Sequence, residues 1–185
     1  MTGRAFVVTC LAAALSSAAP AIAETDSATG FALTLPAGLT LRTSAKGASD
    51  VAWSLLSPSG KPVAANKDGT LCKLTCKALP GNAGLTRQRI NAVVADPKRL
   101  AAIRTNMGQN FDVLDISVIQ HQGFNGYRMK MTPRIGPDAE NVRSMLWIIE
   151  TNKGRASISC ATKAPDWDAA QKLFEAVRSN MTIPG

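Results

Sequence analysis

The sequence predicts an α+β domain in which an antiparallel β-sheet meander is covered by helices, including an amphipathic C-terminal helix. Three observations lead to this class. Apolar residues alternate within short segments of 31–78 and of 111–160, and helical spacing replaces this alternation between them. Short turn signals separate the later strands, and consecutive strands joined by short turns pair antiparallel. A final amphipathic segment can then cover one face of the sheet.

Residues 1–23 have the features of a cleavable signal peptide. Arg4 is the only charge in this segment, an apolar stretch extends from Phe6 to Leu15, and Ala21-Ile22-Ala23 matches a cleavage site of small residues. The stretch is shorter than the about 20 residues that cross a bilayer, and no later stretch is longer. We therefore expect a periplasmic or secreted protein whose mature chain has no transmembrane segment.

Removal of this leader leaves 162 of the 185 residues, the length of one domain. The chain is 45% apolar, close to the about 45–50% of globular proteins, which excludes a disordered, a collagen-like or a multi-pass membrane protein. Residues 24–30 are small and polar and predict a flexible lead-in. Residues 31–185 are expected to form a single α+β domain.

The first strands are predicted at 31–35, 51–56 and 71–78. In the last of these, a period of two divides the side chains between two faces. One face holds Cys72, Leu74, Cys76 and Ala78, and the other holds Leu71, Lys73, Thr75 and Lys77. We expect the first face to be buried and the lysine face to be mostly solvated.

Helices are predicted in two places. Within 85–107 the apolar residues have helical spacing, and Asp96-Pro97 indicates an N-cap followed by proline at the first helical position, so two short helices are expected there. The clearest helix is predicted at 165–181, with one apolar stripe of Trp167, Ala170, Phe174, Val177 and Met181.

Strands are expected again between these helical regions, at 111–121, 127–135, 143–151 and 155–162. Gly and Asn residues at 123–126 and 152–154 indicate hairpin turns. In the first of these strands, Leu114, Ile116 and Val118 are expected on one face, opposite Asp115 and Ser117.

Three cysteines remain after the leader, Cys72, Cys76 and Cys160, and an odd number in an oxidising compartment predicts one disulfide and one free thiol. Along a strand, Cys72 and Cys76 lie about 13 Å apart at about 3.3 Å per residue, whereas a disulfide needs Cα atoms within about 7 Å. Cys160 is therefore expected to pair with either Cys72 or Cys76. A redox role and three free buried thiols are the alternatives.

His121 is the only histidine of the chain, and its place between a strand and Gln122-Gly123 favours a surface turn. As a general base it would need a nucleophile and an orienting carboxylate, and no motif supplies them. As a zinc ligand it would need thiols, which the disulfide uses. We expect no catalytic residue, no cofactor and no metal site.

Basic residues gather in the predicted helical region, at Arg87, Arg89, Lys98, Arg99 and Arg104, against Asp96 alone. Such a surface attracts an anionic lipid, a cell-wall polymer or an acidic protein, and a solvated helix face is the alternative. Nucleic acid is disfavoured by the predicted export and by the aromatic content of 5%, because single strands bind by stacking on aromatic side chains.

Three segments resemble the PsbP-like family of small secreted proteins, which is named for a photosystem extrinsic subunit. They are the first strand FALTLPAGL, the late hairpin LWIIETNKGRASISCAT and the C-terminal EAVRSNMTIPG. The resemblance implies an α-β-α sandwich and a binding or assembly factor without an active site.

These features together predict a non-catalytic exported binding or assembly-factor module that contacts a protein or an anionic envelope component. The alternative is a small secreted hydrolase or a thiol-dependent enzyme that uses His121 or a free cysteine.

Overall fold

The computed structural model describes residues 22–185, so most of the predicted signal peptide lies outside the described residues. The strands are β1 (Ala23–Asp26), β2 (Phe31–Thr34), β3 (Thr40–Thr43), β4 (Val51–Leu56), β5 (Thr70–Ala78), β6 (Phe111–His121), β7 (Phe124–Pro133), β8 (Val142–Glu150), β9 (Gly154–Lys163) and β10 (Met181–Thr182). The helices are α1 (Arg87–Val94), α2 (Pro97–Met107) and α3 (Trp167–Ser179).

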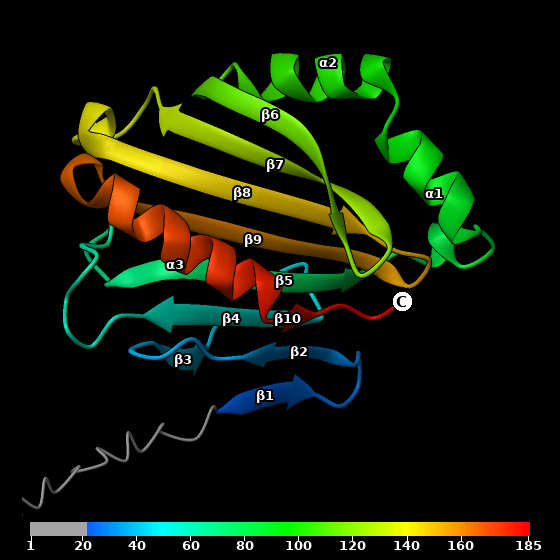
Figure 1. Ribbon diagram of the computed structural model, residues 1–185, viewed down its shortest axis with the longest axis horizontal. Helices are drawn as coiled ribbons and strands as arrows, with labels where there is room; N and C mark the ends of the chain where they lie inside the picture. The colour runs from blue at the N-terminus through cyan, green and yellow to red at the C-terminus, as the bar shows by residue number, and fades with distance from the viewer. Residues whose placement is uncertain (1–21) are drawn as a thin grey trace, which may run out of the picture.

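Seven of these strands form one antiparallel sheet in the order β3-β4-β5-β9-β8-β7-β6, which Figure 1 shows as the centre of the molecule. Strands β6 to β9 pair with their chain neighbours as a meander, and β5 pairs with β9. A second, three-stranded sheet has the order β1-β2-β10. The predicted α+β class with an antiparallel sheet and a C-terminal helix is confirmed.

Helix α3 covers one face of the large sheet and crosses it in front of β9 in Figure 1. Its residues Ala170, Phe174 and Val177 are fully buried and belong to the same core as Trp147 of β8 and Ile158 of β9. This packing explains the predicted apolar stripe, because burial of each large apolar side chain contributes about 1.5–3 kcal/mol to the stability of the folded state.

Helices α1 and α2 lie in the connection between β5 and β6 and contact β7 and β6. Helix α2 begins as the sequence predicts, because Asp96 caps it by accepting a hydrogen bond from the backbone N–H of Lys98. Helix α1 is capped by Thr86, which accepts a hydrogen bond from the backbone N–H of Arg89. In α1, Ile90 and Val94 are buried against the sheet.

The structure corrects the prediction of a flexible lead-in at 24–30. Ala23–Asp26 forms β1 and pairs with β2, and Asp26 then accepts a hydrogen bond from the backbone N–H of Thr29 in the following turn. Strand β2 would otherwise expose unpaired backbone groups along this edge. The side chains of β1 are mostly exposed, so no apolar alternation marks it in the sequence.

Two further details of the predicted elements were wrong. Leu114 does not share the face of Ile116, because the register of β6 against β7 shifts between Val113 and Asp115 and leaves Leu114 59% exposed. Met181 does not extend the last helix: α3 ends at Ser179, and Met181 is buried in β10, which pairs with β2.

Candidate partner-binding surface

The face of the large sheet opposite α3 is covered at one end only. Helices α1 and α2 lie over β7 and β6, whereas Lys73 and Lys77 of β5 and Arg155 and Ser159 of β9 remain exposed. These side chains alternate with buried residues such as Leu74, Cys76, Ala156 and Ile158 of the α3 side. The predicted lysine face of β5 is therefore part of a larger polar surface.

Strand register brings four cations from three strands onto this surface. Arg42 of β3 is opposite Ser54, Ser54 is opposite Lys73, and Lys73 is opposite Ser159. In a second row Lys77 is directly opposite Arg155, and Arg155 is opposite Glu150. We call Arg42, Lys73, Lys77 and Arg155 the cationic sheet face.

Glu150 links this face to the predicted basic helical region. The side chain of Arg99 from α2 donates a hydrogen bond of 2.8 Å to Oε1 of Glu150, and that of Arg155 donates one of 2.6 Å to the same atom. Glu150 is only 7% exposed. Because one carboxylate meets two guanidinium groups, the three residues together retain a net positive charge.

The other four predicted basic residues are dispersed over α1 and α2. The guanidinium of Arg87 lies 4.8 Å from the centre of the Phe124 ring, and Arg104 donates a weak hydrogen bond of 3.4 Å to the carbonyl of Val113. The side chains of Arg89 and Lys98 are exposed and make no hydrogen bond or ion pair within residues 22–185. Of the five predicted residues, Arg99 is the one that reaches the cationic sheet face through Glu150.

A cavity of about 420 Å³ opens beside Arg42 and Lys73. It is lined mainly by hydrogen-bonding side chains, which are Arg42, Ser44, Ser54, Asn66, Asp68, Thr70, Lys73 and Ser159. The backbone N–H of Thr70 donates a hydrogen bond of 2.9 Å to the carboxylate of Asp68, and this bond is the main cause that lowers the pKa of Asp68. The guanidinium of Arg42, 3.7 Å from this carboxylate, lowers the pKa further. The lining can therefore hold a hydroxylated or anionic group.

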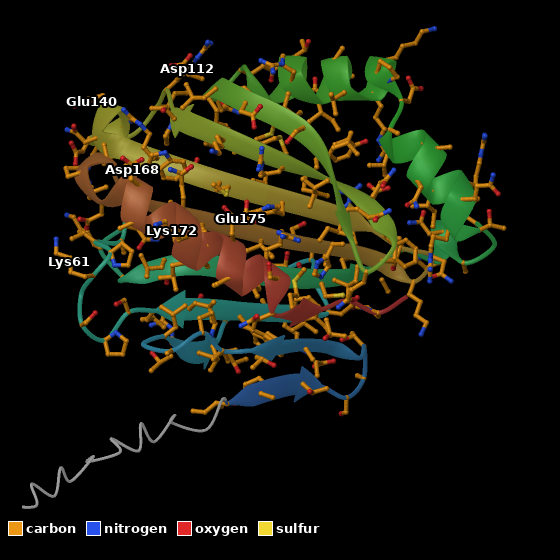
Figure 2. The ribbon with its side chains drawn as sticks, in the orientation of Figure 1. Lys61, Asp112, Glu140, Asp168, Lys172 and Glu175 are labelled. Carbon is orange, nitrogen blue, oxygen red and sulfur yellow. A yellow bond between two sulfur atoms is a disulfide. The ribbon has the colours of Figure 1, made fainter. Side chains whose placement is uncertain are left out.

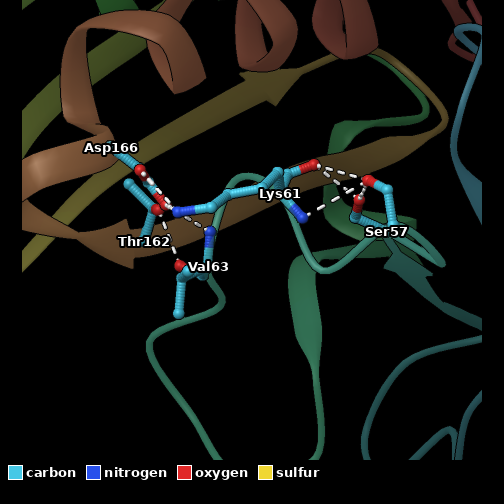
Figure 3. A network of polar contacts seen from close by, with 6 residues as sticks. Ser57, Lys61, Val63, Thr162 and Asp166 are labelled. Atoms are coloured by element: carbon cyan, nitrogen blue, oxygen red, sulfur yellow. Dashed lines mark hydrogen bonds and ion pairs between the residues drawn. The ribbon is translucent and has the colours of Figure 1, made fainter.

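The loop that carries Asn66 and Asp68 is fastened to the start of α3, as Figure 3 shows. Asp166 accepts a 2.7 Å hydrogen bond from the backbone N–H of Val63, which lowers the pKa of this carboxyl group, and forms an ion pair with Lys61. Thr162 of β9 donates to the carbonyl of Val63 over 2.7 Å. This network positions one wall of the cavity.

His121 is 7% exposed, which corrects the predicted surface turn. Its Nε2 lies 2.9 Å from the carbonyl of Met181, and its Nδ1 lies 3.3 Å from the guanidinium of Arg178. This guanidinium donates in turn to Glu175 of α3. Nε2 therefore donates and Nδ1 accepts. Burial lowers the pKa of His121. Its two ring nitrogens are occupied by contacts that fasten β10 and α3 to the end of β6.

The cysteines occupy the α3 side of the sheet. Cys72 and Cys160 are opposite each other in β5 and β9 and form a disulfide with Cα atoms 4.0 Å apart, whereas Cys76 is opposite Ala156 and is free and buried. Burial raises the pKa of the Cys76 thiol to about 11. A thiol in this state is a poor nucleophile.

Residues 22–185 contain no cluster of three or more histidine, cysteine or carboxylate residues that could hold a metal ion. In the same part of the chain, each helix is too short or too polar to cross a membrane.

No protein-family model matches the chain, and no curated protein sequence matches it. Solved structures do resemble it. Cyanobacterial PsbP (CyanoP) from Synechocystis sp. PCC 6803 matches with a TM-score of 0.57 and 12% identity, over 94% of this chain and 98% of its own. LpqN, which is involved in cell envelope biogenesis of Mycobacterium tuberculosis, matches with a TM-score of 0.50 and 8% identity, over 91% of this chain and 88% of its own. The predicted PsbP-like fold is thereby confirmed.

Proposed function

We propose that this protein is a non-catalytic, exported binding or assembly-factor module, and that its cationic sheet face contacts an anionic component of the cell envelope. The observation that carries this proposal is the set of Lys73, Lys77 and Arg155 side chains on the part of the sheet that α1 and α2 leave exposed. Arg89 and Lys98 extend the positive charge onto the neighbouring helices.

Export is supported by the leader-like sequence of residues 1–23 and by the disulfide between Cys72 and Cys160, since disulfides persist in oxidising compartments. The likeness to LpqN, a protein of envelope biogenesis, favours the same compartment. Neither residue named for catalysis supports the enzyme alternative: both nitrogens of His121 are occupied, and the Cys76 thiol stays protonated.

Electrostatics favours an anionic surface over a neutral one as the contact. Lys73 and Lys77 are exposed and have no side-chain partner in the described part of the chain. Each lysine near an anionic membrane contributes about 1 kcal/mol to binding, and every 1.4 kcal/mol corresponds to about tenfold in affinity. The attraction decays over a Debye length of about 8 Å at physiological salt, so only the cations nearest the contact count.

Co-sedimentation with vesicles tests this proposal. We expect the protein to bind vesicles of equal parts phosphatidylglycerol and phosphatidylcholine, and to bind pure phosphatidylcholine much more weakly. Lys73→Gln and Lys77→Gln should each weaken binding about 5-fold, and together about 30-fold. Raising the salt concentration should erase most of the difference between the two vesicle types.

The matched control is Lys172→Gln, which removes one lysine charge from α3 on the other side of the sheet (Figure 2). This variant should change vesicle binding less than twofold. If Lys172→Gln weakens binding as much as Lys73→Gln, the overall charge of the protein and not the cationic sheet face causes the attraction. Equal binding to the two vesicle types at low salt would contradict an anionic partner.

A further inference from the structure

A second, smaller cavity of about 220 Å³ lies where α2 crosses the sheet. Ile103 and Met107 of α2 and Ile148 of β8 supply an aliphatic wall, and Tyr127 of β7 adds an aromatic ring. The cavity is distinct from the larger polar one beside Lys73, with which it shares no lining residue. Its lining combines an apolar wall with charged groups at one end.

The hydroxyl of Tyr127 has no hydrogen-bond partner among residues 22–185. The side chain is 1% exposed, and burial raises the pKa of its phenol, so the hydroxyl is a neutral donor. A buried donor without a partner is costly, and such groups in native proteins call for an explanation. An acceptor atom on a bound molecule would satisfy it.

Arg99 and Arg155 supply positive charge at the same cavity. Each donates to Oε1 of Glu150, at 2.8 Å and 2.6 Å, but a guanidinium has five N–H donors. Both therefore keep donors for a further acceptor, and one carboxylate does not neutralise two cations. The guanidinium of Arg99 also lies 6.0 Å from the centre of the Tyr127 ring, which places this charge close to the tyrosine side chain.

We propose that this cavity binds a small organic carboxylate with an aliphatic body. The carboxylate would accept hydrogen bonds from Arg99, Arg155 and Tyr127, and the body would lie against Ile103, Met107 and Ile148. Since a water molecule takes about 30 Å³ of liquid volume, the cavity holds the equivalent of roughly seven waters, which suits a chain about as long as octanoate. The inference goes beyond the proposed function: Arg155 belongs to both sites, but Lys73 and Lys77 of the cationic sheet face lie outside this cavity.

Calorimetric titration of the whole protein with octanoate, below its micelle concentration, tests the proposal. We expect one octanoate per chain, with octanol and acetate each at least tenfold weaker, because octanol lacks the charge and acetate lacks the body. The chain has one tyrosine, so the Raman Fermi doublet of tyrosine should change as its hydroxyl becomes a donor. Failure of octanoate to bind, or equal binding of octanol, overturns the proposal.

Tyr127→Phe removes only the hydroxyl. It should weaken octanoate binding about tenfold, while the melting temperature without octanoate stays equal or rises, because the variant loses an unpaired buried group. An unchanged affinity for octanoate in Tyr127→Phe refutes the assigned hydrogen bond. A lower melting temperature also refutes it, since the hydroxyl would then have a partner within the protein.

Asn106→Asp provides a second variant, because Asn106 is exposed on α2 and lines the cavity. The added negative charge should weaken octanoate binding at least fivefold, and Gln88→Glu, the same change on α1, should not. Equal effects of the two variants overturn the location of the site. Lys73→Gln should weaken vesicle binding and leave octanoate binding unchanged, so failure of the proposed function and failure of this inference are distinguishable.

Discussion

Removal of the Cys72–Cys160 disulfide gives the sharpest test of the structure. The bond joins residues 88 positions apart, and a cross-link over a loop of this length stabilises a protein by about 4–5 kcal/mol on the chain-entropy estimate. Replacement of both residues by alanine should lower the free energy of unfolding by about this amount. Both sulfur atoms are buried, so their loss from the core adds to the effect.

Urea unfolding followed by tryptophan fluorescence measures this change. At an m-value of about 2 kcal/mol/M, the midpoint of the double variant should fall by about 2 M urea. The control is Cys76→Ala, which removes a buried sulfur and no covalent bond and should cost about 1 kcal/mol. A double variant that loses no more stability than Cys76→Ala refutes the cross-link. Alkylation of Cys72 in the unreduced, unfolded protein would refute it as well.

Three smaller perturbations test the rest of the fold. Because burial holds the pKa of His121 below its ordinary 6.5, the unfolded chain binds more protons than the folded chain in acid. The free energy of unfolding should therefore fall as pH drops below about 6.5. In His121→Gln, the urea midpoint should depend less on pH over this range. The Cys76 pKa of about 11, against an ordinary 9.0, predicts alkylation at least about 100-fold slower in the folded protein than in urea, as followed by mass spectrometry. A Cβ at Gly126 would lie 2.6 Å from the carbonyl oxygen of Ile148, so Gly126→Ala should cost about 1–3 kcal/mol in a thermal melt.

Alternation in the sequence separated the buried Cys72, Leu74 and Cys76 of β5 from the exposed Lys73 and Lys77, but it did not predict which residue faces which across the sheet. At the ends of the strand it was wrong, because Leu71 is buried and Ala78 is exposed. Cys72 and Cys76 have the same place in the pattern, and only the register of β5 against β9 opposes Cys72 to Cys160 and Cys76 to Ala156. Register depends on contacts along both whole strands. The choice between the two cysteines was therefore a property of the fold and not of the local sequence.

The same limit applied to the candidate surface. The sequence separated Lys73 and Lys77 from the buried face. Arg155 lies next to Lys77 and to Glu150 only because β9 pairs with β5 and with β8. Arg99 reaches Glu150 only because α2 is placed over this part of the sheet. The unpaired hydroxyl of Tyr127 has no sequence signal at all. Strands β1 and β10 were missed because their segments are short, and pairing with β2 rather than an apolar pattern defines them.

The disulfide and the cationic sheet face are two sides of the same strand pair. Lys77 and Arg155 are directly opposite each other, and like charges in this position destabilise a sheet. A sequence selected for stability alone would avoid the pair, and such departures in natural proteins concentrate at functional sites. We expect the Cys72–Cys160 bond to offset part of this repulsion, since it holds β5 and β9 in register from the α3 side. Its removal should therefore weaken vesicle binding even under conditions in which the double alanine variant remains folded.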